Sequence, residues 1–118
     1  MDNEAVTLDV AEALLRFSGN RQIFVKLLDR FLELNAGVGE KTLRVVEEGD
    51  CGNMALFFHS IKGGAGNLSA RALYHKAAEL EGLAQAGDLA AVRAEVPAFL
   101  DLFERLRRAA DDVRNSAL

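Results

Sequence analysis

The chain has 118 residues, half of them apolar and 27% charged, and its formal net charge is -4 at neutral pH. This size supports one compact domain, which we place over residues 1–118, and the composition excludes a disordered or fibrous protein. No apolar run approaches the roughly 20 residues that span a bilayer, so we expect no membrane segment. Nucleic-acid binding is not expected either, because it needs clustered Lys and Arg on a basic surface.

The cellular compartment and the metal content are predicted from a few residues. Residues 1–4 are acidic and lack the basic region and apolar stretch of a secretory signal, so we expect a cytoplasmic chain, and a monomer. The single cysteine, Cys51, cannot form an internal disulfide, which agrees with a reducing compartment. A metal site built from Cys51, His59 and His75 lacks the ligand spacing that zinc requires, so we expect no bound metal.

The spacing of apolar residues predicts an all-α protein, because they recur at intervals of three and four and sustained alternating runs are absent. A short first helix begins at Thr7 or Asp9 and ends in residues 18–20. A second helix begins near Asn20, and its apolar residues are Ile23, Phe24, Leu27, Leu28, Phe31, Leu32 and Leu34.

The apolar pattern thins between Asn35 and Gly39 and then resumes until residues 48–50. One long helix with a weak centre and two separate helices both fit this pattern. We predict one helix, because no proline intervenes and Gly37 alone costs only about 1 kcal/mol.

The remaining helices are predicted from their capping residues. The third helix begins at Asp50 and ends in a turn at residues 67–69, and Ser69 is expected to cap a fourth helix that ends at Gly87. Asp88 caps the last helix. A short helix followed by four longer ones with short connections predicts an antiparallel four-helix bundle with a short additional N-terminal helix.

The third helix carries the most informative residue of the chain, His59. On a helical wheel with about 100° per residue, His59 points about 140° away from the apolar stripe. That stripe consists of Met54, Phe58, Ile61, Ala65 and Leu68. The small residues on the side of His59 are Gly52, Ala55, Gly63 and Gly66. We therefore expect the imidazole to face solvent among small side chains.

Glycine next to an outward histidine indicates access for another macromolecule. Gly63 costs roughly 0.8–1 kcal/mol relative to alanine inside a helix, so its presence needs a reason. A small residue leaves room for a partner to bring a bulky electrophile to the ring, whereas close packing of two helices is the alternative explanation. Imidazole has an ordinary pKa of about 6.5, and the positive charge of nearby Lys62 disfavours its protonation. We predict that His59 is a nucleophile that a partner approaches from outside.

The run HSIKGGAGNL at residues 59–68 resembles the signature of histidine-containing phosphotransfer (HPt) domains of two-component phosphorelays. The resemblance covers most of the chain, since Leu80-Glu81 and residues 24–31 resemble the helices next to that signature. The family often has Gly where this sequence has Ser69. The family pattern of His, two residues, Lys, Gly, small residues and Leu is met at His59, Lys62, Gly63, Ala65 and Leu68.

The resemblance implies a phosphocarrier and not an enzyme. His59 would accept a phosphoryl group from the aspartyl phosphate of a receiver domain, in a response regulator or a hybrid sensor kinase, and pass it to another receiver. That partner would supply the catalytic groups and Mg²⁺, so the chain itself needs no cofactor. Lys62 would stabilise the phosphoryl charge. The surface that the receiver approaches would consist of Ala55, Gly63 and Gly66.

Glu81 is the candidate for orienting the imidazole. A hairpin that turns at residues 67–69 brings Glu81 roughly level with His59, and the equivalent acid in the HPt module of chemotaxis-type kinases orients the histidine. An ordinary surface ion pair is the alternative for Glu81.

Three other functions stay open at the level of sequence. A binding-only bundle would dock receivers without being phosphorylated. An HPt module of a chemotaxis-type kinase, which residues 59–66 also resemble, would receive its phosphate from ATP through a separate kinase domain. The dimerisation and phosphoacceptor helix pair of a sensor kinase fits less well, because an acid usually follows the histidine there and Ser60 follows it here.

Overall fold

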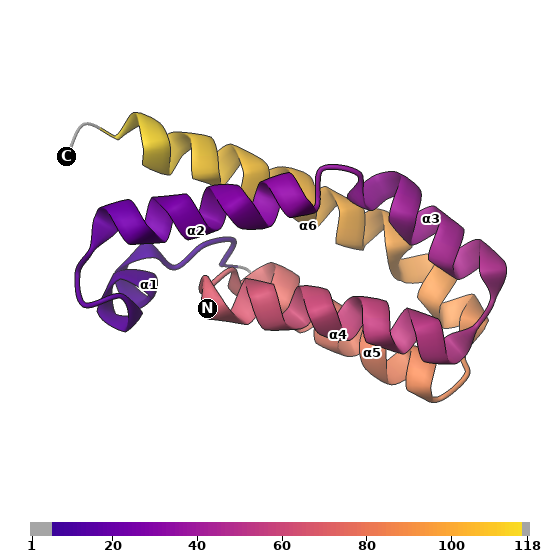
Figure 1. Cartoon of the computed structure of the whole chain (residues 1–118). Coiled ribbons are helices and arrows are strands. Elements are labelled where there is room, and N and C mark those ends of the chain that lie inside the picture. Colours follow the sequence, from indigo (N-terminus) through magenta and orange to yellow (C-terminus); the bar gives the residue numbers. More distant parts are fainter. Residues whose placement is uncertain (1–5, 117–118) are drawn as a thin grey trace.

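The computed structural model describes residues 6–116, and every regular element in this range is a helix. The all-α class predicted from the sequence is confirmed for these residues. Figure 1 shows how the helices are arranged. In chain order they are α1 (Val10–Arg16), α2 (Arg21–Leu34), α3 (Val38–Glu48), α4 (Cys51–Asn67), α5 (Arg71–Gln85) and α6 (Leu89–Asn115).

Four helices begin where a short polar side chain caps them. The side chains of Asp9, Asn20 and Asp50 each accept a backbone N–H three residues later at 3.0 Å, and Asp88 does so at 3.1 Å. Such caps satisfy backbone donors that have no partner within the helix. The predicted starts at Asn20, Asp50 and Asp88 are confirmed, and Asp9 rather than Thr7 caps α1.

The prediction of one long helix over residues 20–48 is wrong, because the chain breaks between α2 and α3. The side-chain amide of Asn35 donates a hydrogen bond to the carbonyl of Phe31 at 2.8 Å. The same carbonyl also accepts the backbone N–H of Asn35 at 3.2 Å, so the side-chain bond adds to the last helical bond at the point where α2 ends. Gly37 is the N-cap residue of α3. Together with Gly39 it lowers the helix propensity of this segment further.

The predicted cap at Ser69 is also wrong, because α5 starts one residue later, after Ala70. Ser69 is buried in a left-handed conformation with a φ of 60°, at the position where the HPt pattern often has Gly. The N-terminal segment holds this turn in place. The guanidinium of Arg16 donates to the hydroxyl of Ser69 at 2.8 Å and to the carbonyl of Asn67 at 3.0 Å, and the N–H of Asp9 donates to the carbonyl of Ser69 at 2.9 Å.

The helices enclose one apolar core. α4 and α5 form a hairpin that packs against α6, while α2 and α3 follow one another along α6 on the other side of the core (Figure 1). The ring of Phe58 on α4 is fully buried and meets Phe99 on α6 edge to face at 5.3 Å. The apolar stripe predicted for the third helix is buried as expected. In contrast, Ile23, Leu27 and Leu34 of α2 are exposed.

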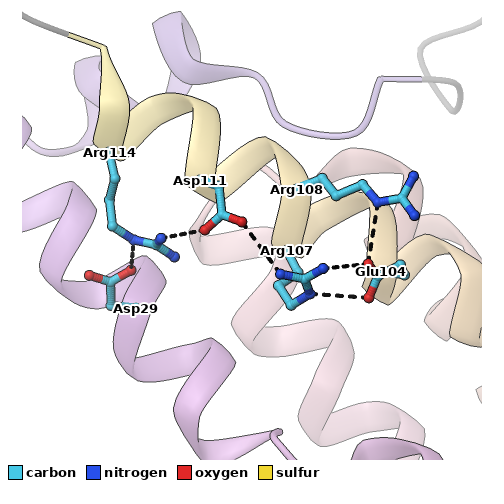
Figure 2. Close-up of polar contacts among 6 residues, drawn as sticks. All are labelled: Asp29, Glu104, Arg107, Arg108, Asp111 and Arg114. Carbon is cyan, nitrogen blue, oxygen red and sulfur yellow. Dashed lines mark hydrogen bonds and ion pairs between the residues drawn. The ribbon is translucent and has the colours of Figure 1, made fainter.

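Figure 2 shows a row of ion pairs on the outside of α6. Arg107 and Arg108 both pair with Glu104, and the Nε of Arg114 lies 2.6 Å from a carboxylate oxygen of Asp29 on α2. Each exposed pair contributes little to stability. The consequence is that these cations already have carboxylate partners on the protein itself.

Within residues 6–116, no helix combines the length and the apolar character that crossing a bilayer requires.

The burial of Phe58 predicts a large loss of stability on truncation. Phe58→Ala should lower the free energy of unfolding by about 3–5 kcal/mol, because it removes buried contacts and leaves a cavity. Urea denaturation followed by circular dichroism measures this change. Leu56→Ala, on the same helix but 69% exposed, should change it by less than about 0.5 kcal/mol. Equal losses in the two variants would contradict the assignment of Phe58 to the core.

Candidate functional site

His59 lies on the outer face of α4, and its side chain is 63% exposed. Phe58, directly before His59, and Ile61, two residues after His59, both point into the core. This alternation follows from the helical period and agrees with the orientation predicted by the wheel. The imidazole is therefore reachable from solvent while its backbone is held by a packed helix.

Glu81 on α5 connects His59 with Lys62. One carboxylate oxygen of Glu81 lies 2.9 Å from Nδ1 of His59, and the other lies 2.7 Å from Nζ of Lys62. The side chain of Glu81 is only 13% exposed, so both contacts are partly shielded from water. The structure thus brings together three of the residues singled out from the sequence.

The contact with Glu81 fixes which imidazole nitrogen is free. An ionised carboxylate can only accept hydrogen bonds, so Nδ1 of His59 carries the proton and donates it to Glu81. In the neutral imidazole the other nitrogen, Nε2, then has a lone pair. The geometry leaves Nε2 as the ring nitrogen that is able to act as a nucleophile.

The ionisation of Glu81 and Lys62 is coupled by their contact. The hydrogen bond from Lys62 lowers the pKa of the Glu81 carboxyl below its ordinary value, with a further lowering from His59, while partial burial opposes both. The same contact raises the pKa of the Lys62 ammonium. Glu81 therefore stays ionised beside the imidazole, and the positive charge of Lys62 is already balanced by a carboxylate.

The small residues around His59 have different surroundings. A side chain at Gly63 would meet nothing within 4 Å, which agrees with an open surface there. Gly66 differs from the expectation, because a Cβ atom on it would lie 3.0 Å from the ring of Tyr74. Its missing side chain makes room for that ring. Ala55 is half-buried and packs against the core, so it contributes less surface than expected.

The second glycine of the run, Gly64, is explained by a packing contact. A Cβ atom on Gly64 would lie 2.5 Å from the ring of Phe31 on α2, far inside van der Waals contact. The ring of Phe31 also stacks on Phe103 at 5.9 Å, so a shift of this ring would disturb that contact. Gly64 therefore makes room for the ring of Phe31 against α4.

Tyr74 is a neighbour of the site that the sequence analysis missed. It lies on α5 seven residues before Glu81, and this two-turn spacing places both on the same helix face. This spacing can be read from the sequence, so Tyr74 could have been predicted to lie near the site. The other histidine, His75, meets the ring of Tyr74 edge to face at 5.3 Å.

Among residues 6–116, no group of three or more His, Cys, Asp or Glu side chains is arranged to hold a metal ion. Cys51 is a free, half-buried thiol at the start of α4.

The two adjacent glycines should respond oppositely to alanine. Gly63→Ala should raise the free energy of unfolding by about 0.8–1 kcal/mol, because the new methyl group meets open space in a helix interior. Gly64→Ala should lower it by about 1–3 kcal/mol, because the methyl group collides with Phe31. Thermal or urea unfolding of both variants measures the difference. A stabilising effect at both positions would contradict the contact between Phe31 and Gly64.

The contact between Lys62 and Glu81 predicts a change in titration. Lys62→Gln should raise the pKa of Glu81 towards its ordinary value, which NMR of the carboxyl carbon measures. Because folding lowers this pKa, ionised Glu81 stabilises the fold at pH values above its ordinary pKa of about 4.3. This contribution to the free energy of unfolding is lost as the pH falls through the lowered pKa. The variant should lose part of that pH dependence. Lys76→Gln, which removes a cation bound to Glu79 and Glu95 instead, should leave Glu81 unaffected. An unchanged Glu81 titration in Lys62→Gln would disprove the coupling.

Comparison with known proteins gives one match. Residues 21–113 match the family model described as the Hpt domain, a range that includes the helix with His59 and the helix with Glu81. No curated protein and no solved structure matches the chain. Hpt domains are phosphotransfer modules of phosphorelays, and they carry phosphoryl groups without catalysing the transfer themselves. With most of its length covered by this match, the chain belongs to the Hpt domain family.

Proposed function

We propose that this chain is a histidine phosphocarrier in a two-component phosphorelay and that His59 is its phosphoacceptor. One observation carries the proposal: an exposed imidazole whose Nδ1 is bound to Glu81 at 2.9 Å, so that Nε2 is left free at the surface. The phosphoryl group comes from the aspartyl phosphate of a receiver domain, and another receiver aspartate takes it away.

The transfer step is an in-line displacement at phosphorus. The lone pair of Nε2 attacks the phosphorus atom, the Nε2–P bond forms, and the bond between phosphorus and the aspartyl oxygen breaks. The departing carboxylate takes the bonding electrons. The imidazole ring gains positive charge during attack, and the carboxylate of Glu81 at Nδ1 stabilises that charge. Transfer to the next receiver is the same step in reverse.

Lys62 acts in two ways in this proposal. In the unphosphorylated state its ammonium group holds Glu81 in place through the 2.7 Å contact. After transfer, its positive charge lies one helical turn from a group with roughly two negative charges and helps to neutralise it. Gly63 leaves the approach to Nε2 open.

The partner supplies what this chain lacks. Phosphoryl transfer commonly uses a divalent metal near the moving charge, and the receiver would provide both Mg²⁺ and the acidic pocket that holds it. The chain would act as one domain and as a cytoplasmic monomer. Its scaffold would be an antiparallel four-helix bundle in which α2 and α3 together form one interrupted rod.

A second source of phosphate is favoured by the same contact. The run at residues 59–66 together with Glu81 resembles the HPt module of chemotaxis-type kinases, in which a kinase domain phosphorylates the histidine from ATP. The acceptor atom and the role of Glu81 would be unchanged. Only the donor would differ.

Replacement of His59 tests the proposal directly. His59→Gln should abolish radiolabelling by receivers charged with labelled phosphate, and the wild-type label should be labile to acid and stable to base, as expected for phosphohistidine. His75→Gln is the matched control, since it replaces the other histidine of the chain, and it should be labelled normally. Label that persists in His59→Gln would refute the assignment. Binding of receivers without any label would instead support a docking module, and label only from ATP and a kinase domain would identify the second donor.

A further inference from the structure

We propose that Arg16 is a positioning residue for phosphotransfer: by holding the turn between α4 and α5, it keeps Glu81 within reach of Nδ1 of His59. This inference rests on the proposed function and adds a residue that acts at a distance from the imidazole. It assigns a role to the N-terminal segment, residues 6–17, which hydrogen bonds to that turn.

The N-terminal segment is anchored on the bundle. Ala13 of α1 is fully buried, and Leu14 and Phe17 pack against the core. The ring of Phe17 also stacks on Phe24 of α2 at 6.1 Å. α1 lies at the end of the bundle where α4 and α5 join (Figure 1). Arg16 therefore extends from a helix whose own place is fixed by packing.

The N-terminal segment supplies hydrogen-bond partners to both helices of the hairpin. Arg16 donates to the carbonyl of Asn67, the last residue of α4, at 3.0 Å. The N–H of Ala72, in the first turn of α5, donates to the carbonyl of Val6 at 2.8 Å. α5 needs such a partner because its N-cap residue, Ala70, makes no side-chain cap. A cation at the C-terminal carbonyls of α4 is also favoured by the helix dipole.

The residue between the two helices has a backbone conformation that depends on this support. Two backbone hydrogen bonds, at 2.9 and 3.2 Å, close a Schellman motif over residues 65–70. Ser69 is the left-handed residue of this motif, with a φ of 60°, where glycine is preferred. A serine stays in such a conformation only where its surroundings hold it. Arg16 bonds to its hydroxyl at 2.8 Å, and the N–H of Asp9 bonds to its carbonyl at 2.9 Å.

The angle at the turn decides where Glu81 lies. Glu81 follows Ser69 by twelve residues, about 18 Å along α5, so a tilt of α5 by about 4° moves its carboxylate by roughly 1 Å. Its contact with Nδ1 of His59 is 2.9 Å, and a hydrogen bond lengthened by that amount is lost. Burial of apolar side chains pulls α4 and α5 together without a preferred direction, whereas hydrogen bonds are directional. The bonds at the turn therefore fix the angle that the site requires.

Loss of the contact with Glu81 would change the imidazole in two ways. A neutral imidazole carries its proton on either nitrogen, and the hydrogen bond to Glu81 selects Nδ1. Without that bond, a share of the rings carries the proton on Nε2, and these rings cannot attack phosphorus through that atom. The carboxylate also no longer stabilises the charge that the ring gains during attack.

The test compares Arg16→Met with Arg21→Met. Both remove a guanidinium at the same end of the bundle and keep an apolar side chain, but Arg21 donates to the carbonyl of Val113 on α6 and not to the turn. Long-range ¹H–¹⁵N NMR at about pH 8, where imidazole is neutral, measures the tautomer of His59. Phosphoramidate measures the reactivity of the ring without a protein donor, because attack by Nε2 breaks its P–N bond and releases ammonia.

Arg16→Met should lower the share of the Nδ1–H tautomer and slow labelling by phosphoramidate about tenfold, because the carboxylate is displaced. Arg21→Met should match the wild type in both measurements. Circular dichroism checks that each variant is folded at the temperature used. Arg16→Lys, which offers one ammonium group to two acceptors, should give a smaller change of the same kind, and it replaces Arg16→Met in the test if that variant does not fold.

A second substitution tests whether Arg16 acts through the turn. Glycine adopts a left-handed φ without strain, so Ser69→Gly should restore the turn where Arg16 is missing. The double variant Arg16→Met/Ser69→Gly should regain most of the Nδ1–H tautomer and most of the wild-type labelling rate. A shifted tautomer that Ser69→Gly does not restore would overturn the turn as the route of action.

The remaining results separate this proposal from the proposed function. A wild-type tautomer and labelling rate in Arg16→Met, or equal losses in Arg21→Met, would overturn the positioning role and leave the phosphocarrier intact. A wild-type chain whose His59 is not labelled by phosphoramidate would overturn the phosphocarrier, whereas the tautomer would still decide whether Arg16 positions the ring.

Discussion

The site depends on one carboxylate that must stay within hydrogen-bond distance of two side chains on another helix. Glu81 is on α5, whereas His59 and Lys62 are on α4, so the contacts exist only in one register of the hairpin. That register is set at the turn, where Ser69 is left-handed and buried. Arg16 of α1 hydrogen bonds to this turn, although α1 lies outside the residues that match the family model. The N-terminal helix thus supports the geometry of His59 from two turns away.

The glycines of α4 share a sequence signal but not a physical cause. Gly64 permits the contact with Phe31, Gly66 permits the contact with Tyr74, and Gly63 alone opens onto free space. Contacts with the rings of Phe31 and Tyr74 offset the helix propensity lost at the first two positions. Only the helix propensity lost at Gly63 is not offset by a packing contact, and for this residue we propose that it keeps the imidazole accessible.

Much of this structure could be predicted from the sequence because helical periodicity is local. The spacing of Met54, Phe58 and Ile61 predicted both the buried face of α4 and the exposure of His59. The break after Leu34 could not be predicted, because one helix with a weak centre and two separate helices are nearly equal in local helix propensity. Gly63 and Gly66 have different surroundings because Tyr74 of α5 lies against Gly66 only. A helical wheel of α4 shows no side chains of other helices, so this difference could not be predicted from it.

The balance of charge around His59 suits a carrier rather than a store of phosphate. Lys62 and Glu81 neutralise one another, so together they add no net charge beside the imidazole. A carrier that releases its group to the next protein gains nothing from binding that group tightly, because every interaction that stabilises the phosphorylated state also raises the barrier to leaving it. A lysine shared with Glu81 attracts the phosphoryl group less than a free one would. In the proposed function, the same contact that orients the imidazole would therefore limit how strongly the site holds a phosphoryl group.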